Sequence, residues 1–549
     1  MKIKRILSLI IAFLLSVALL AGCGSKGDDM GFIHVENGKI VDGSGNPVWL
    51  KGIALGNDVW SNPTEPVLTS HDESSYEDIA SMGFNNVRFY LNYQLFEDDA
   101  NPYIYKEEGF EWLDKNIKWA KKNGIGLILN MHVPQGGYQS QGNGTGLWTD
   151  EESQARLIAL WAEIAKRYSD EEAVIGYGIL NEPIVPDIGT VEESVGQCKN
   201  LMQRITDAIR EVDENHIIFA ERVCAVQSAS GSSDWNIAIS QLQFLLNDNN
   251  TAYEFHCYSP HNFTHQDMDW AGTLGIVKRY PSDEAVVSNV INSWVDCASS
   301  KKTAELEDGW MLYESSLVKR SDKYNVGTIA LRASKIGAEG AAYFDDVVLE
   351  EYKDGELTRE MMLIDFDSNK GDFVFWSQNG SGSHGKVSGG YKSFCYKISG
   401  TTADANVSGC KFELKEGYEY KVKAKVKIEN AGTGASVMPR IDFSLAETIV
   451  SLDIEYLKSE MLANLQFGAL NNVPMYMGEF GACANTFLYG RGGEKWVADM
   501  LDICKEQSVH FTYHAYHEPS FGLYSDPASK LPEMKNEVLA QVFIDKLAN

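Results

Sequence analysis

Two glutamates of this chain stand where apolar runs end, and their type and place suggest acid–base chemistry. In GYGILNEPIVP (176–186) the run ends at Asn181 and Glu182, and in PMYMGEFG (474–481) a second run reaches Glu479. A carboxylate at the end of a buried strand must be solvated, paired or used. Hydrolysis of an acetal needs two carboxyl roles, one to protonate the leaving oxygen and one to attack or to activate water.

The elements that must position these carboxylates alternate between short β-rich runs and helical stretches. The segment 107–124 places Phe110, Leu113 and Ile117 on one helical face and ends at Gly124, a residue typical of helix C-termini. Such alternation predicts an α/β fold, the (β/α)8 TIM barrel. The β-rich runs cover residues 49–56, 85–91, 126–132, 174–183, 216–223, 253–260, 474–481 and 509–518.

The carboxyl ends of the strands of a parallel barrel open onto one face, so the residues there form a candidate site. Glu182 and Glu479 are therefore predicted to face each other. A separation of about 5 Å would give a retaining mechanism, and one of roughly 6.5–9.5 Å an inverting one. The alternative is a solvated Glu182 and an Arg88 that only pairs a buried charge. The strand ends carry Arg88, His132, Asn181, Glu182, His256, Tyr258, Glu479 and His514.

One interval between the predicted strands is too long for a single crossover. More than two hundred residues separate Pro260 from Pro474, and they include short alternating runs with Gly, Asn and Asp turns. That pattern is typical of an antiparallel β-sandwich. We therefore expect a jelly-roll-like domain at 300–445, inserted between barrel strands six and seven, with the barrel at 31–299 and 446–549.

The N-terminus predicts export. Three basic residues precede an apolar run that is too short for a confident transmembrane helix and fits a secretory signal. The sequence LAGC at its end resembles a bacterial lipobox, which makes Cys23 a lipidation site. We expect a signal peptide at 1–23, a polar tether at 24–30, and a protein anchored by lipid outside the cytoplasm. The alternative is an ordinary signal peptide with an incidental cysteine.

Five segments in order resemble glycoside hydrolase family 5, a group of retaining (β/α)8 enzymes. They read NVRFYL, LNMHVPQGG, GILNEP, YEFHCYSP and YMGEFG, and the likeness covers roughly residues 31–280 and 445–549. The resemblance implies that Glu182 is the general acid/base and Glu479 the nucleophile. It also implies roles for four neighbours and for the −1 sugar site: Asn181 at the sugar 2-hydroxyl, Tyr258 orienting Glu479, Arg88 near the nucleophile, His256 near the acid/base and His132 lining the −1 site.

The eighth strand end departs from the family pattern. The family usually carries a Trp there, whereas this chain carries His514. An imidazole stacks less area than an indole but can hydrogen-bond a hydroxyl, which leaves the sugar specificity open. His510, His514 and His517 suggest a metal site, but strand alternation places His517 on the opposite face. The chemistry needs no cofactor or metal.

Aromatic residues in two loops are candidates for stacking on sugar rings. Trp60 follows the first strand, and Tyr138 and Trp148 lie in the Gly- and Gln-rich loop after the third. The alternative for each is a flexible surface loop.

The expected insert resembles pieces of a carbohydrate-binding jelly-roll module, in reverse of their usual order. Trp376, Phe375 and Tyr391 either form a sugar-stacking face or belong to the sandwich core. Cys395 and Cys410 either form a bridge or are free buried thiols.

The acidic composition of the chain argues against polyanionic binding partners. The net charge is −29, from 77 acidic and 48 basic residues, so a polyanion such as DNA would be repelled. We expect a monomeric retaining β-glycoside hydrolase acting on a polysaccharide or oligosaccharide, most simply an endo-β-1,4-glucanase. The alternatives are a β-mannanase, an exo-β-glucosidase, or a non-catalytic glycan-binding surface lipoprotein.

Overall fold

A computed structural model describes residues 31–60, 71–140, 142–526 and 532–548. The predicted signal peptide, Cys23 and the tether at 24–30 lie outside these ranges. Within them, no helix has both the length and the apolar character that a membrane span requires.

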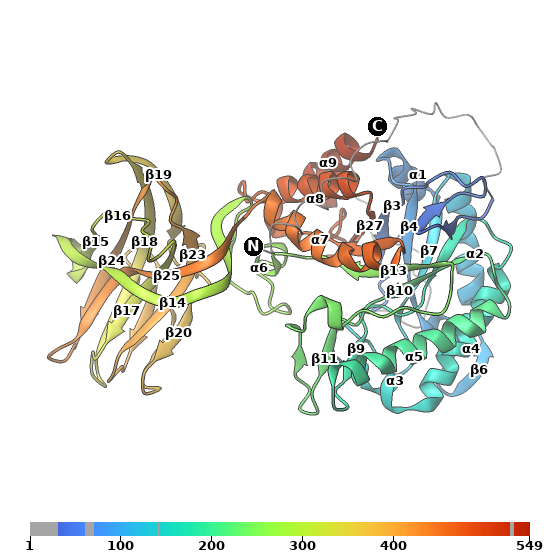
Figure 1. Ribbon diagram of the computed structural model, residues 1–549, viewed down its shortest axis with the longest axis horizontal. Coiled ribbons are helices and arrows are strands. Elements are labelled where there is room, and N and C mark those ends of the chain that lie inside the picture. Colours follow the sequence, from blue (N-terminus) through green and yellow to red (C-terminus); the bar gives the residue numbers. More distant parts are fainter. Residues whose placement is uncertain (1–30, 61–70, 141, 527–531, 549) are drawn as a thin grey trace, which may run out of the picture.

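In the described part of the chain, eight parallel strands close into a barrel, the right-hand body in Figure 1. Each overlaps one of the predicted β-rich runs, so the predicted fold class is confirmed. Their spatial order follows the chain all the way round, as in a (β/α)8 barrel. The strands are β3 (Lys51–Leu55), β4 (Asn86–Asn92), β7 (Gly126–Val133), β8 (Val174–Gly178), β10 (Ile217–Glu221), β13 (Thr251–His256), β26 (Met475–Phe480) and β27 (His510–Tyr513).

Helices surround the barrel and bury their apolar faces against it. The predicted amphipathic helix is α2, which ends at Lys122 and buries Phe110, Leu113 and Ile117. These residues belong to one large core between the strands and the helices. The main helices are α1 (Glu73–Ser81), α2 (Glu107–Lys122), α4 (Glu151–Tyr168), α5 (Val191–Arg210), α7 (Ile454–Asn471), α8 (Gly493–Gln507) and α9 (Glu537–Leu547).

The end of the barrel opposite the carboxyl ends of the strands is filled by apolar side chains. The hairpin β1 (His34–Glu36) and β2 (Lys39–Val41) supplies Ile40, which packs with Ile217 and Tyr476 from the starts of two barrel strands. The hairpin therefore closes that end and leaves the opposite mouth for chemistry.

Short strands and helices lie in the loops around the open mouth of the barrel. They are β5 (Glu97–Asp98), β6 (Asn101–Tyr105), α3 (Thr145–Thr149), β9 (Ile184–Pro186), β11 (Ala225–Gln227), β12 (Ser233–Asp234) and α6 (His261–Thr264). Strand β9 directly follows the Glu182 segment and pairs with β11, which follows the end of β10. These pairings tie the loops of two neighbouring barrel strands together.

The inserted β-domain is longer than predicted. It begins with β14 (Ser282–Glu305) and ends with β25 (Ser436–Leu452), rather than at residues 300 and 445. The two strands pair from Ser282 and Leu452 onward and form a ribbon that joins the two bodies in Figure 1. Much of the first half of β14 is exposed or half-buried, so it lacks the alternating burial that marks a sandwich strand.

Two layers make up the insert. The β17 layer contains β14, β17 (Val326–Ser334), β20 (Val374–Ser377), β23 (Ala405–Glu413) and β25. The β24 layer contains β15 (Met311–Ser315), β16 (Val318–Lys319), β18 (Ala341–Lys353), β19 (Glu356–Ile364), β21 (Ser383–Ser388), β22 (Phe394–Ser399) and β24 (Glu419–Glu429). Side chains such as Leu331 and Phe344 interdigitate between the layers in a core of their own. Cys395 and Cys410 are free buried thiols and form no bridge.

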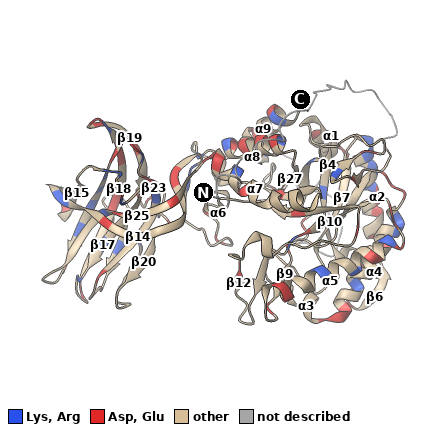
Figure 2. Cartoon of the chain, in the orientation of Figure 1, with Lys and Arg blue, Asp and Glu red and all other residues tan. Residues whose placement is uncertain are grey.

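Buried charges cross the junction between barrel and insert. The Lys278 ammonium, from a barrel loop, lies 2.7 Å from Glu284 in β14 and 3.1 Å from Asp372, which precedes β20. Elsewhere, acidic and basic side chains are interspersed over both bodies (Figure 2).

Candidate active site

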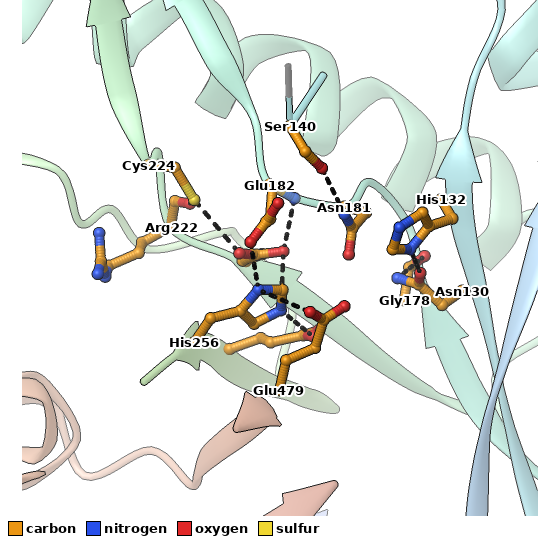
Figure 3. Close-up of polar contacts among 12 residues, drawn as sticks. Asn130, His132, Ser140, Gly178, Asn181, Glu182, Arg222, Cys224, His256 and Glu479 are labelled. Carbon is orange, nitrogen blue, oxygen red and sulfur yellow. Dashed lines mark hydrogen bonds and ion pairs between the residues drawn. The ribbon is translucent and has the colours of Figure 1, made fainter. Parts of the chain in front are cut away.

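The open mouth of the barrel gathers the predicted strand-end residues into one contact network, and Figure 3 shows the part around Glu182, His256 and Glu479. Glu479 from β26 contacts Arg88 from β4, and the loop residue Glu182 contacts His256 from β13. Tyr258 reaches Glu479 as well. One oxygen of Glu182 and one of Glu479 lie within 4.8 Å of each other. The two carboxyl groups therefore face each other, as their positions at the strand ends implied.

Glu479 is held by three hydrogen-bond donors. Its Oε1 accepts from Arg88 Nη1 at 2.7 Å and from the Tyr90 hydroxyl at 2.6 Å. Its Oε2 accepts from the Tyr258 hydroxyl at 2.8 Å. Only 5% of the residue is exposed, so the carboxylate is fixed in position and largely dry.

Burial alone would raise the pKa of Glu479, but nearby positive charge outweighs it. His256, His514 and Arg88 together hold the pKa well below its ordinary value of 4.5. Glu479 is therefore ionised at neutral pH, which a nucleophile requires.

Arg88 is completely buried and connects three groups. Besides Glu479, its Nη2 lies 2.7 Å from Glu254 Oε1 and 2.9 Å from Asn181 Oδ1. Because the amide oxygen of Asn181 accepts from Arg88, its NH₂ group points elsewhere, 3.3 Å from the Ser140 hydroxyl. Arg88 thus fixes the orientation of both Glu479 and Asn181.

Carboxylates face both ring nitrogens of His256. Nδ1 lies 2.8 Å from Glu182 Oε1 and 3.6 Å from Glu479 Oε2. Nε2 lies 3.4 Å from Glu254 and 3.5 Å from Glu221. Burial lowers the pKa of His256, but these carboxylates raise it well above 6.5, so the ring is an imidazolium that donates from both nitrogens.

A wall of parallel rings lines one side of the mouth. Tyr90 stacks on His132 with ring centroids 4.0 Å apart, and His514 lies nearly parallel to Tyr90 at 5.9 Å. Trp60, 39% exposed, contacts all three rings, and Tyr138 lies 5.7 Å from His132. Burial holds the pKa of His132 well below 6.5, so that ring is neutral.

The proposed sugar contact at Trp148 is wrong. Its loop folds into α3, which turns Trp148 inward, where it is 8% exposed and packs in the barrel core. Its indole donates to Gln139 Oε1 at 2.9 Å. The structure thus leaves Trp60 and Tyr138 beside the site and removes Trp148 from it.

The three histidines near the C-terminus do not converge. His510, the first residue of β27, accepts from the Leu50 amide at the closed end of the barrel. His517 stacks on His71, 5.7 Å away. Only His514 lies at the mouth, where its Nδ1 is 3.0 Å from the Tyr90 hydroxyl.

Sequence reasoning missed three residues of this network: Tyr90, Glu221 and Glu254. Strand periodicity offered a signal for each. Tyr90 lies two residues beyond Arg88 and Glu254 two before His256, so each shares a strand face with a predicted site residue. Glu221 is the last residue of β10 and was therefore a strand-end carboxylate like the others.

Metal binding has a candidate donor set here, since Glu182, His256 and Glu479 each offer a ligand atom within 4.8 Å of the others. The same atoms already accept from or donate to Arg88, Tyr258 and one another. Two cations, Arg88 and His256, thus occupy the place that a metal ion would take in balancing the carboxylates.

A barrel with two facing carboxyl groups at its mouth defines a class of glycosidase-like proteins. A family model described as cellulase (glycosyl hydrolase family 5) matches residues 41–319, about half of the chain. The chain belongs to this family.

Curated relatives share part of the chain. Endoglucanase C of Acetivibrio thermocellus is 33% identical over 202 residues, which cover 36% of this chain and 53% of that protein. A beta-xylosidase of Phanerodontia chrysosporium is 31% identical over 274 residues, 43% of this chain and 53% of that one. The chain thus spans about half the length of these relatives.

Solved structures of endoglucanase Cel5A from Thermotoga maritima, including a complex with cellobiose, align over 90% of this chain and 97% of theirs, with 16% identity and a TM-score of 0.46.

Proposed function

We propose that this protein is a retaining β-glycoside hydrolase that cleaves a β-1,4-glucan within the chain. The observation that carries the proposal is the approach of Glu182 and Glu479 to within 4.8 Å. This oxygen-to-oxygen approach favours the short carboxyl separation of retaining enzymes over the roughly 6.5–9.5 Å of inverting enzymes.

The contacts assign a part to each catalytic group. The ionised Glu479 attacks the anomeric carbon, while Glu182 gives its proton to the leaving oxygen. Glu182 then takes a proton from the water that hydrolyses the glycosyl ester. Of the two Glu479 oxygens, Oε1 accepts from Arg88 and Tyr90 and Oε2 only from Tyr258 among the described side chains. We therefore assign the attack to Oε2.

Neighbouring side chains would hold the sugar. The Asn181 NH₂ group, whose orientation is fixed by the bond from Arg88 to the amide oxygen, would donate to a 2-hydroxyl. His132 and His514 present ring edges at the −1 sugar, and the exposed Trp60 offers a stacking face. His514 replaces an aromatic floor with a hydrogen-bonding one, so a β-mannanase or an exo-β-glucosidase remains the alternative.

Endoglucanase C of Acetivibrio thermocellus supports the choice of a β-glucan substrate. We infer further that the protein is exported, lipidated at Cys23 and held at a membrane surface as a monomer. The basic N-terminus, the apolar run and the LAGC sequence support this. Cys23→Ala should move the protein from the membrane fraction to the soluble fraction, and an unchanged distribution would contradict lipid anchoring.

The insert is proposed to bind glycan through the outer face of the β17 layer. Phe375 packs into the sandwich core, so strand alternation turns the 54%-exposed Trp376 outward. Trp294, equally exposed, hydrogen-bonds Asp442 on the outer face of the same layer. Four strand spacings separate β20 from β14, or about 19 Å, enough for a chain of sugars.

Polar groups lie between these tryptophans. The Arg440–Asp442 ion pair, 2.6 Å apart, is only 10% and 14% exposed in its side chains, so it forms the floor of the face. Tyr391 is a poorer sugar platform, because the Lys425 ammonium covers its ring at 3.6 Å. The paired exposed indoles with polar groups between them favour sugar binding over a purely structural insert.

Release of reducing ends tests the catalytic proposal. The protein from residue 24 onward is incubated with carboxymethyl cellulose, mixed-linkage glucan, xyloglucan, glucomannan and galactomannan. Activity on one glycan that disappears in Glu479→Gln but persists in Glu192→Gln, a control in helix α5, supports it. If the wild type and Glu479→Gln both bind a glycan without hydrolysing it, the protein is a glycan-binding lipoprotein instead. If Glu479→Gln retains activity, Glu479 is not the nucleophile.

Affinity electrophoresis in the same glycans tests the insert. Trp294→Ala and Trp376→Ala together should abolish retardation, while Phe394→Ala, an exposed ring of the β24 layer, should not. Retardation that survives the double change would assign glycan binding to another surface.

A further inference from the structure

The backbone at Glu182 has a conformation that must be held in place. Its φ angle is +42°, in the left-handed region that residues with a side chain rarely adopt. Such a residue costs of order 1–3 kcal/mol and persists only where its surroundings fix it. The chain on either side is anchored, since the Asn181 amide donates to Met131 and the Cys224 amide to Pro183. Glu182 itself needs a partner between these two anchors.

Glu221 is that partner. Its Oε2 accepts from the Glu182 backbone amide at 2.7 Å, and Glu221 is completely buried as the last residue of β10. Burial raises the pKa of Glu221 to about 8 against the opposing charge of His256, and in either protonation state the carboxyl keeps an acceptor oxygen for the amide. A buried polar group in this position is retained at a cost in desolvation.

A second route joins Glu221 to Glu182 through His256. The imidazolium donates from Nδ1 to Glu182 Oε1 at 2.8 Å (Figure 3). Its Nε2 faces Glu221 at 3.5 Å. Glu221 therefore acts on both the backbone and the side-chain partner of the same residue.

The structure assigns Glu221 as a positioning residue for the acid/base Glu182, which it holds in line with the leaving oxygen of the substrate. This inference rests on the proposed glycosidase function. Glu221 touches no sugar itself; it acts through the Glu182 amide and through His256.

Glu254 provides the contrast. It pairs with Glu221 across β10 and β13, and it is equally buried. Its carboxylate, however, lies 2.7 Å from Arg88, which in turn holds Glu479. Glu254 also lies 3.4 Å from His256 Nε2, so the two buried carboxyl groups differ in their other contact: Glu221 holds the Glu182 amide, whereas Glu254 holds Arg88.

Loss of support for the acid/base and loss of support for the nucleophile should affect substrates with different leaving groups differently. An aryl β-cellobioside with a dinitrophenyl group needs no proton on departure, whereas a phenyl or alkyl leaving group does. A displaced acid therefore harms only the second kind of substrate. A displaced nucleophile harms both equally.

The experiment measures kcat/KM, which reports the glycosylation step, across a series of aryl β-cellobiosides. Glu221→Ala should leave dinitrophenyl cellobioside within about threefold of the wild type and lower the phenyl substrate by on the order of 10- to 100-fold, part of the 10²–10⁴ that general acid catalysis contributes. Glu221→Gln, which keeps an acceptor oxygen for the Glu182 amide, should recover most of that loss. Glu254→Gln, the matched control, leaves the Glu182 amide bond to Glu221 in place and weakens the pair with Arg88, so it should lower the dinitrophenyl substrate as well as the phenyl substrate.

Parallel loss in Glu221→Ala, or no loss, would overturn the inference. Glu221→Asp covers the case in which Glu221→Ala fails to fold, because it keeps the carboxyl group but moves it away from the Glu182 amide. Its kcat/KM should depend more strongly on the leaving group than that of the wild type, as for Glu221→Ala. Glu182→Ala separates the two proposals. If kcat/KM of Glu182→Ala does not depend on the leaving group, the acid/base assignment fails. If kcat/KM depends strongly on the leaving group in Glu182→Ala but not in Glu221→Ala, only the role of Glu221 is refuted.

Discussion

At the scale of single residues, the two glutamates proposed as catalytic differ through their neighbours. Glu479 is 6% exposed in its side chain and accepts from Arg88, Tyr90 and Tyr258. The Glu182 side chain is 23% exposed and lies against His256. The two carboxyl groups thus have different surroundings, as the two roles in the proposed retaining mechanism require.

Tyr90→Phe should lower kcat by roughly 10- to 100-fold. The change removes the hydrogen bond to Glu479 Oε1, and a bond to a charged group is worth about 1.5–3 kcal/mol. The ring itself and its stacking on His132 would remain. Tyr93→Phe, which loses a hydroxyl bonded to Asp99, is the control and should leave kcat unchanged. A Tyr90→Phe enzyme with wild-type kcat would show that Arg88 and Tyr258 suffice.

The pH dependence of the reaction should report the charge around Glu479. Activity falls as the pH falls through the pKa of this carboxylate, and that pKa lies well below 4.5, so the acid limb of kcat/KM should lie below pH 4.5. His514→Gln removes one of the side chains that lower this pKa. The acid limb should therefore move to higher pH, while His34→Gln in the N-terminal hairpin should not move it. A limb shifted toward acid would contradict this account.

At the scale of elements, the barrel and its mouth were predictable because buried parallel strands read as apolar runs that end in polar residues. Trp148 was misjudged, since its Gly-rich loop gave no sign of the short helix that turns it inward. Glu221 and Glu254 were missed because their roles depend on the pairing of β10 with β13, which one sequence does not display. The limits of the insert were misplaced because the ribbon that begins at Ser282 is largely exposed.

The close approach of β13 and β26 makes Gly478 a sensitive position. A Cβ atom there would lie 1.7 Å from Glu254 Oε1, so Gly478→Ala must displace the carboxylate that pairs with Arg88. We expect a loss of about 1–3 kcal/mol in unfolding free energy and a fall in kcat, measured by thermal unfolding and cellulose assays. Gly196→Ala in helix α5, where a Cβ meets nothing within 4 Å, should instead stabilise by about 0.5–1 kcal/mol. Equal melting temperatures for the two variants would refute the argument.

At the scale of the whole molecule, buried charge fixes the insert to the barrel. Lys278→Met leaves the partly exposed Glu284 and Asp372 without their ammonium, and a loss of this kind costs about 1–3 kcal/mol. The first unfolding transition in calorimetry should therefore fall, while kcat on short soluble substrates stays unchanged. Lys415→Met removes a looser pair with Asp283 at 3.8 Å and should have little effect. A Lys278→Met protein that melts like the wild type would show that the β14–β25 ribbon alone holds the insert.

The pairing of Ser282 with Leu452 also bears on how the chain assembles. Strands β13 and β26 are neighbours in the barrel although the whole insert separates them in sequence. If a connection of that length were disordered, closing the barrel would carry the entropic cost of closing a long loop. That cost grows by about 0.6 kcal/mol with each doubling of loop length. Once the insert has folded, its two ends are paired side by side, and the connection between β13 and β26 is effectively shortened to the segments His256–Ser282 and Leu452–Met475. The folded insert thus brings β26 and β27, the last two barrel strands, close to the six barrel strands that precede it in the sequence.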